Sequence, residues 1–166
     1  MKRKKETTIH IGNKMIAENQ PAFIIAEAGI NHNGNLELAK KLVDAAVDAK
    51  VDAVKFQLRN LESLYTEKAL KQTGSEDIGT QYLLSLIKEA VLDKNHFKEM
   101  SLYCKKKNIL FLCTPWDTTA VDILEDLHVP AYKIASADLV NFELLEYASS
   151  DPKLFDPLKQ KRVGEF

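Results

Sequence analysis

Apolar residues are arranged in two patterns along this chain, short apolar runs and a spacing of three or four positions. Four short segments rich in apolar residues predict buried strands, at 22–27, 51–58, 109–114 and 131–136. Between them, apolar residues recur every three or four positions, which predicts helices over 36–47, 81–91, 95–107 and 119–127. A further helix is predicted to begin at Leu144. The stretch 59–79 has little apolar periodicity and predicts an excursion after the second strand.

The alternation of strands and helices predicts an α/β fold with a parallel sheet and right-handed crossovers. Asp117 and the two threonines after it offer N-cap side chains for the helix over 119–127. The rhythm stops after Tyr147, because 149–166 contains two prolines and no apolar strand pattern. The pattern therefore indicates a small open α/β domain or the front part of a larger one.

Composition and charge narrow the class of protein. The 166 residues are 45% hydrophobic and 28% charged, which is typical of a globular domain. A net charge of −1 gives no electrostatic case for nucleic acid or an anionic membrane as partner. The basic start is followed by polar residues, so it does not resemble a secretory signal, and no apolar run approaches the ~20 residues of a membrane span. Cys104 and Cys113 could form a lone disulfide, but we expect reduced thiols in a cytoplasmic protein.

Polar groups stand at the ends of all four predicted strands. In order along the chain they are Glu27, Lys55, Thr114 and Lys133. Lys55 shares a strand face with Gln57, because side chains alternate along a strand. Ligands of α/β folds bind at the carboxyl ends of the strands, and two lysines with several hydroxyls suit a phosphorylated or carboxylated anion. The alternative for either lysine alone is a side chain that lies along apolar surface with its ammonium group in water.

A polar cluster follows the first predicted strand in FIIAEAGINHNG, residues 23–34. His32 is either a ligand or a loop histidine satisfied by local hydrogen bonds. Gly29 and Gly34 supply turn geometry before the next helix. Asn31 and His32 are therefore weaker candidates for a site than the strand-end residues.

Several motifs in order resemble one enzyme family. They are FIIAEAGINHNGN, AVKFQ, SEDIGTQYLL, FLCTPWD and VPAYKIASADL, spread from about residue 9 to residue 147. Together they resemble the N-acetylneuraminate (sialic acid) synthase family, which includes legionaminate and pseudaminate synthases. The resemblance implies a (β/α)8 TIM-type barrel followed by an antifreeze-like domain that reaches into the partner's site in a homodimer.

The resemblance also implies a reaction. Enzymes of this family condense phosphoenolpyruvate with an N-acylated aldose such as N-acetylmannosamine and release phosphate, assisted by manganese or magnesium. Carried over by motif, Lys55 and Lys133 would bind phosphoenolpyruvate, Thr114 and Ser136 would donate hydroxyls to it, and Gln57 would contact the sugar. Glu27 and Asp138 would be the catalytic acids, and Asn31 and His32 would belong to the loop over the first strand end.

The resemblance ends near Tyr147. We therefore expect the first half of the barrel, about four βα units over 21–148, after a lead-in at 1–20 and before a tail at 149–166 without family counterpart. The metal-binding histidines of the family fall in the missing half, so we expect no metal ligands in this chain. A half barrel has open strand edges and exposed apolar area.

Because half of the site would be missing, we expect no condensation activity from the chain alone. Two alternatives stay open at this point. One is another phosphoenolpyruvate-dependent 3-deoxy-keto-acid synthase, which the GINHNG and TPWD motifs favour less. The other is a non-catalytic subunit that binds anions or pairs with a complementary half barrel.

Overall fold

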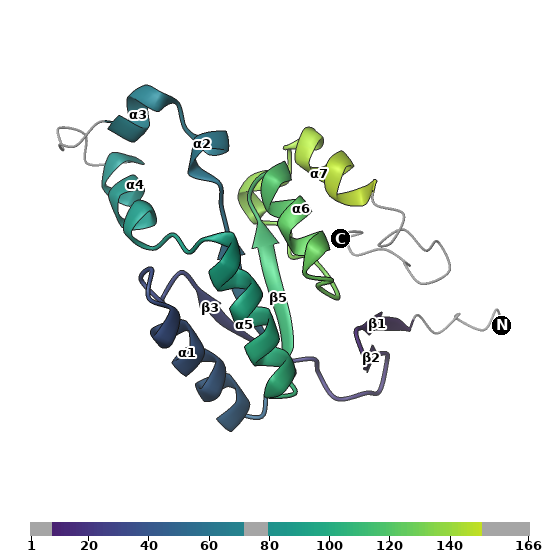
Figure 1. The fold of residues 1–166 in the computed structure, drawn as a ribbon. Coiled ribbons are helices and arrows are strands. Elements are labelled where there is room, and N and C mark those ends of the chain that lie inside the picture. The colour runs from purple at the N-terminus through teal and green to yellow at the C-terminus, as the bar shows by residue number, and fades with distance from the viewer. Residues whose placement is uncertain (1–7, 72–79, 151–166) are drawn as a thin grey trace.

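A three-stranded parallel sheet forms the centre of the protein (Figure 1). The computed structural model describes residues 8–71 and 80–150, with the backbone alone for 80–83. The sheet order is β3 (Ile25–Gly29), β4 (Ala53–Leu58) and β5 (Leu110–Pro115), so β4 lies in the middle. Both strand pairs are parallel, as the βα rhythm predicted.

The helices begin where side chains cap them. Asn35, Asp93 and Asp117 each accept a hydrogen bond from a backbone N–H of the first helical turn. They begin α1 (Leu36–Asp48), α5 (Lys94–Lys106) and α6 (Thr118–Asp126). The remaining helices are α2 (Leu61–Leu64), α3 (Glu67–Lys71), α4 (Thr80–Glu89), the short 3-10 helix η1 (Ser136–Asp138) and α7 (Phe142–Ser149).

The two faces of the sheet differ in chemistry. Val54 and Phe56 of β4 point toward the helices and are fully buried, in a core with Phe97 and Met100 of α5. The ring of Phe56 stacks on Phe111 of β5, 5.8 Å between centroids. Burying each such side chain stabilises the fold by about 1.5–3 kcal/mol. Lys55 and Gln57 alternate with these residues and therefore lie on the opposite face.

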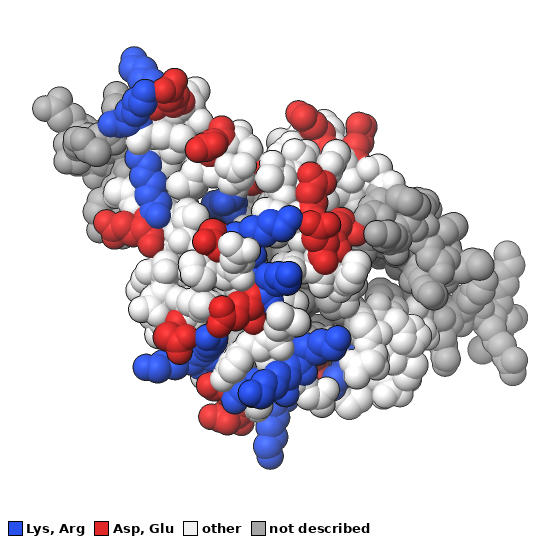
Figure 2. Space-filling view, in the orientation of Figure 1, with Lys and Arg blue, Asp and Glu red and all other residues white. Residues whose placement is uncertain are grey.

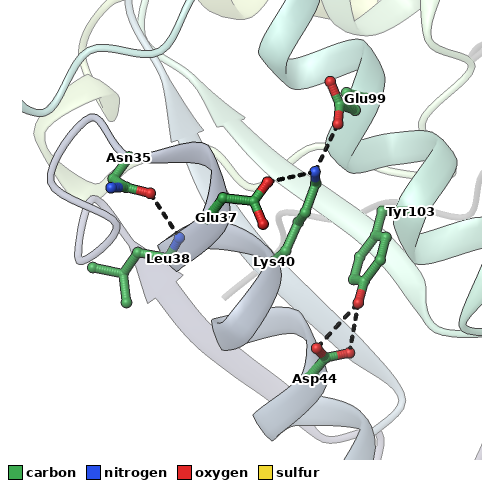
Figure 3. A network of polar contacts seen from close by, with 7 residues as sticks. All are labelled: Asn35, Glu37, Leu38, Lys40, Asp44, Glu99 and Tyr103. Atoms are coloured by element: carbon green, nitrogen blue, oxygen red, sulfur yellow. Dashed lines mark hydrogen bonds and ion pairs between the residues drawn. The ribbon is translucent and has the colours of Figure 1, made fainter.

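Polar contacts join α1 to α5 on the outer surface (Figure 3). Lys40 Nζ lies 2.8 Å from Glu37 Oε1 and 2.7 Å from Glu99 Oε1, and these two carboxylates raise the pKa of Lys40. The Tyr103 hydroxyl donates to the Asp44 carboxylate at 3.0 Å. The contacts fix the alignment of the two helices over the sheet.

A small antiparallel hairpin lies at the N-terminal ends of the central strands. It consists of β1 (Ile9–Ile11) and β2 (Lys14–Ile16) and falls within the segment predicted only as a lead-in. A Cβ on Gly12 would lie 2.9 Å from Leu110 Cδ2, so this turn approaches the start of β5 closely. Lys14 forms an ion pair of 3.0 Å with Asp52, which also accepts a hydrogen bond from the Ile24 N–H. The hairpin is thus joined to the end of the sheet where the strands begin.

The predicted fourth strand, 131–136, is wrong. Tyr132 makes a single parallel bridge to Cys113, and the Lys133 N–H donates to the Cys113 carbonyl at 3.1 Å. Pro130 has no N–H to extend this pairing, and η1 bends the backbone away from Ser136 onward. The segment runs beside β5 but does not continue the sheet.

The stretch after β4 contains α2 and α3, which the sequence did not predict. Residues 72–79 and 151–166 lie outside the described part, as does the first half of the SEDIGTQYLL segment, 75–79. Cys104 and Cys113 are both free and buried, so the prediction of reduced thiols is confirmed. Burial raises the pKa of Cys104 to about 12.

Figure 2 shows how charge is distributed on one face. Basic side chains gather toward the C-terminal end of α5, whereas acidic side chains gather over α6 and α7. Leu139, Val140 and Phe142 are 76%, 73% and 69% exposed, so apolar area is exposed beside α7 as expected for a partial barrel. Among the described residues, no helix is long and apolar enough to cross a membrane.

Candidate functional site

Lys55, in the middle of β4, forms the centre of a polar group on the sheet face opposite the helices. Its Nζ lies 2.5 Å from Glu27 Oε2 and donates to Thr114 Oγ1 at 3.3 Å. Lys55 is 5% exposed and Thr114 is 2% exposed, whereas the Glu27 side chain is 54% exposed. A buried ammonium group thus has one buried hydroxyl partner and one carboxylate partner that reaches solvent.

Strand register brings these three side chains together. Glu27 of β3 pairs directly with Lys55 of β4, and Gln57 pairs with Thr114 of β5. Because residues two apart share a face, Thr114 lies on the Lys55 side of the sheet. The structure therefore confirms that Glu27, Lys55 and Thr114 converge, as their positions at strand ends predicted.

The backbone turns sharply just after Glu27. The β3–β4 register shifts between Glu27 and Gly29, and Gly29 has a φ of +56°, a conformation that favours glycine. A Cβ on Gly29 would lie 3.2 Å from Glu27 Oε1 and 3.4 Å from Gln57 Nε2. Glycine thus leaves room for these two side chains to face the same small space.

Gln57 has a charged neighbour that the sequence prediction missed. Arg59 Nη2 donates to Gln57 Oε1 at 2.7 Å, and the Arg59 guanidinium stacks over Trp116 with its Cζ 4.1 Å from the ring centroid. Burial lowers the pKa of Arg59. The signal was present in the sequence, because Arg59 comes two residues after Gln57 at the end of a strand.

His32 is enclosed in the loop after β3. It is 1% exposed, its Nδ1 accepts a hydrogen bond from the Gly34 N–H at 3.2 Å, and its ring lies 6.0 Å from that of Phe56. Its Nε2 has no hydrogen-bond partner among the described residues. Burial lowers the pKa of His32. These contacts favour the loop-histidine interpretation, whereas Asn31 is exposed.

The remaining predicted residues are not joined to Lys55. Lys133 and Ser136 are exposed, and within the described part their side chains make no hydrogen bond or ion pair. Asp138 is 7% exposed and its Oδ1 accepts from Asn141 Nδ2 at 3.1 Å. The nearest link of Asp138 to the site is electrostatic, because its charge favours the charged form of Arg59.

The described residues do not fit a divalent metal. Across 8–71 and 80–150, no three His, Cys, Asp or Glu side chains come together in a way that could hold an ion. The Glu27 carboxylate is paired with Lys55, and His32 has no second ligand-type side chain beside it among these residues. We therefore assign no metal chemistry to them.

Comparison with known proteins matches this arrangement to one family. The family profile of NeuB matches residues 42–154, which include Lys55, Thr114 and Lys133. The chain belongs to the NeuB family. This NeuB chain is 42% identical over 150 residues to the N,N'-diacetyllegionaminic acid synthase of Campylobacter jejuni, covering 86% of the chain and 44% of that protein.

Other NeuB relatives agree in sequence and in fold. The spore coat polysaccharide biosynthesis protein SpsE of Bacillus subtilis is 36% identical over 84% of the chain and 37% of its own length. The crystal structure of an N-acetylneuraminic acid synthetase from Leptospira borgpetersenii, in complex with citrate, is 40% identical with a TM-score of 0.74. That match covers 87% of the chain and 46% of the solved one. The chain thus spans less than half the length of these relatives and shares the α/β fold of part of a synthase barrel.

Proposed function

We propose that this NeuB chain carries the phosphoenolpyruvate-binding part of a sialic-acid-type synthase. The complete reaction would condense phosphoenolpyruvate with an N-acylated aldose such as N-acetylmannosamine and release phosphate. Relatives named as legionaminic and N-acetylneuraminic acid synthases support this proposal, and they favour it over synthases of other 3-deoxy-keto acids. With two buried free thiols, a cytoplasmic location fits the proposal.

One observation carries the proposal: the buried ammonium group of Lys55 lies between Glu27 and Thr114. A buried cation needs a partner, because leaving one charge unpaired away from water is strongly unfavourable. Glu27 supplies that partner here, at 2.5 Å, but more than half of its side chain is exposed. An incoming phosphate or carboxylate can therefore replace it at Lys55 without leaving the cation unpaired.

This exchange suggests a role for each residue of the group. Once an anion takes the place of the carboxylate at Lys55, Glu27 is free to orient the water that adds at C2 or to move a proton to or from an oxygen at the reacting centre. Thr114 and Lys55 would hold the anion, and Gln57 would contact the sugar. In the reaction, C3 of the enol forms a bond to the aldehyde carbon, water adds at C2, and the C2–O bond to phosphate breaks.

Lys133 and Ser136 would complete the anion contacts, and Asp138 would be a second acid. All three follow the single bridge at Tyr132, where Lys133 and Ser136 are exposed and Asp138 is buried. In the family, a divalent metal supplies polarisation of the aldehyde carbonyl. The described residues offer no ligand set for it, so we expect no turnover by this chain with phosphoenolpyruvate, N-acetylmannosamine and manganese.

Calorimetric titration with phosphoenolpyruvate tests the proposal. We expect Lys55→Met to weaken binding about ten-fold or more, because a charge-assisted hydrogen bond contributes ~1.5–3 kcal/mol. Thr114→Val should weaken binding less, and Thr114→Ser should keep the wild-type affinity. Lys40→Met is the matched control, since Lys40 is also ion-paired but lies on the outer helices. Unchanged binding in Lys55→Met, or no binding by the wild-type chain, would overturn the proposal.

A further inference from the structure

Arg59 lies immediately after β4 and is held by residues from separate segments. Its guanidinium donates to Gln57 Oε1 and stacks on the Trp116 ring that follows β5. A guanidinium stacked on a tryptophan is attracted by the face of the ring, and more strongly the further it is removed from water. Arg59 is half-buried, so its position is more constrained than that of a surface arginine.

Asp138 interacts electrostatically with the same guanidinium. The Asp138 carboxylate is buried, and its Oδ2 has no hydrogen-bond partner among the described residues. Its negative charge favours the charged form of Arg59.

The contact with Arg59 determines which way the Gln57 amide points. A guanidinium has donors and no acceptor, so its partner on Gln57 must be the carbonyl oxygen. The Nε2 group is then left on the other side of the amide. It lies 3.4 Å from the place that a Cβ on Gly29 would occupy, and Glu27 Oε1 lies 3.2 Å from the same place. Gln57 thus presents a donor to the space that Glu27 also faces.

We propose that Arg59 is a positioning residue that commits Gln57 to donate its Nε2 hydrogen to an oxygen acceptor of the sugar, a hydroxyl or a carbonyl. This inference rests on the proposed function, because it concerns the same site and the aldose substrate. Without Arg59, the amide could rotate by about half a turn at little cost and present its oxygen instead. Arg59 therefore acts on sugar binding through Gln57, and not on phosphoenolpyruvate.

Nitrogen–proton NMR of the whole chain measures both the environment of the Gln57 side-chain amide and the binding of each ligand. The side-chain amide signals of Gln57 are assigned by their loss in Gln57→Glu, and the chain is titrated separately with N-acetylmannosamine and phosphoenolpyruvate. We expect Arg59→Met to move the Gln57 amide signals and to weaken N-acetylmannosamine binding about five- to ten-fold, the loss of one oriented hydrogen bond. Phosphoenolpyruvate affinity should stay within about two-fold, as the Lys55 group is unchanged.

Two further variants separate positioning from folding. Gln57→Glu keeps an oxygen acceptor for Arg59 and so should fold, but it offers the sugar no N–H donor and should also bind N-acetylmannosamine more weakly. Arg59→Lys keeps one donor and should recover part of the affinity. Lys107→Met is the control, because it removes a cation that is paired with Asp44 and stacked on Tyr103 on the outer helices. It should change neither affinity.

The outcomes distinguish this inference from the function on which it rests. If Arg59→Met or Gln57→Glu binds N-acetylmannosamine as the wild type does, the positioning role is wrong while the anion site stands. Equal weakening of both ligands by Arg59→Met would mean a structural role only, and would also overturn it. Wild-type binding of phosphoenolpyruvate without N-acetylmannosamine overturns the inference alone, whereas binding of neither overturns the proposed function with it.

Discussion

Gly34, in the loop after β3, packs against the backbone of Glu89 at the end of α4, so that a Cβ on Gly34 would overlap the Glu89 carbonyl oxygen. The φ of Gly34 is +70°, which other residues adopt only with strain. The contact joins the loop that carries His32 to the helix preceding α5. The position therefore requires glycine for two independent reasons.

We expect Gly34→Ala to lower the free energy of unfolding by about 2–4 kcal/mol, from backbone strain and steric overlap together. Urea unfolding followed by circular dichroism measures this. Gly12→Ala is the control: Gly12 also has a positive φ, of +58°, but its Cβ would meet the end of the flexible Leu110 side chain. It should cost about 1–2 kcal/mol. If both substitutions lowered the free energy of unfolding equally, the Glu89 backbone would have to move to make room for the added methyl group.

Asp117 joins the N-terminus of α6 to the loop after β4. Its Oδ1 accepts from the Ala120 N–H at 2.8 Å, and its Oδ2 accepts from the Asn60 N–H at 2.7 Å. Asp117→Ala removes both bonds at a position that is 8% exposed, and we expect a loss of about 2–3 kcal/mol in the free energy of unfolding.

Asp93 provides the comparison for Asp117. It caps α5 through the His96 N–H at 2.9 Å, its Oδ1 also lies 3.2 Å from His96 Nδ1, and it is exposed. Asp93→Ala should therefore cost only about 1 kcal/mol, the usual contribution of a cap. If the two substitutions cost the same by urea unfolding, the bond to Asn60 contributes nothing.

His32 makes stability depend on pH. Because burial lowers its pKa in the folded state, the unfolded chain binds a proton first as the pH falls below ~6.5. The stabilisation by neutral His32 is fully present above that pH and is lost as the pH falls toward the folded pKa. Unfolding free energies at pH 7 and pH 5 should therefore differ more in the wild type than in His32→Asn.

Asparagine at position 32 still offers an acceptor to the Gly34 N–H but does not titrate. The control is His128→Asn, at an exposed histidine whose left-handed backbone, φ +52°, asparagine also adopts. It shows what the same change of residue type does at a histidine outside the loop after β3. An equal dependence in the wild type and in His32→Asn would show that His32 can be protonated without loosening the loop.

The sequence predicted helices and strands well where they depend on interactions between residues close together in the chain. The apolar spacing over 36–47 and the cap at Asp117 correspond to α1 and the start of α6. The fourth strand failed because a run of apolar residues after Pro130 does not say whether a neighbouring strand pairs with it. The three-residue strands around Gly12 are too short to show alternation.

The candidate site was predicted in part for the same reason. Glu27 and Lys55 could be expected at neighbouring strand ends, but their direct contact depends on register, which tertiary packing decides. Arg59 was missed because its role depends on its contacts with Gln57 and Trp116. These two residues are 59 positions apart, so the sequence does not show that one arginine contacts both.

The hairpin around Gly12 has a consequence for how this protein can change. It is attached at the beginnings of β4 and β5, whereas Lys55 lies two residues further along β4 and Thr114 four residues further along β5, about 7–13 Å at ~3.3 Å per residue. Substitutions in the hairpin can therefore alter resistance to heat or proteolysis without reaching the polar group. Stability and the chemistry of the polar group can therefore be changed by separate sets of substitutions.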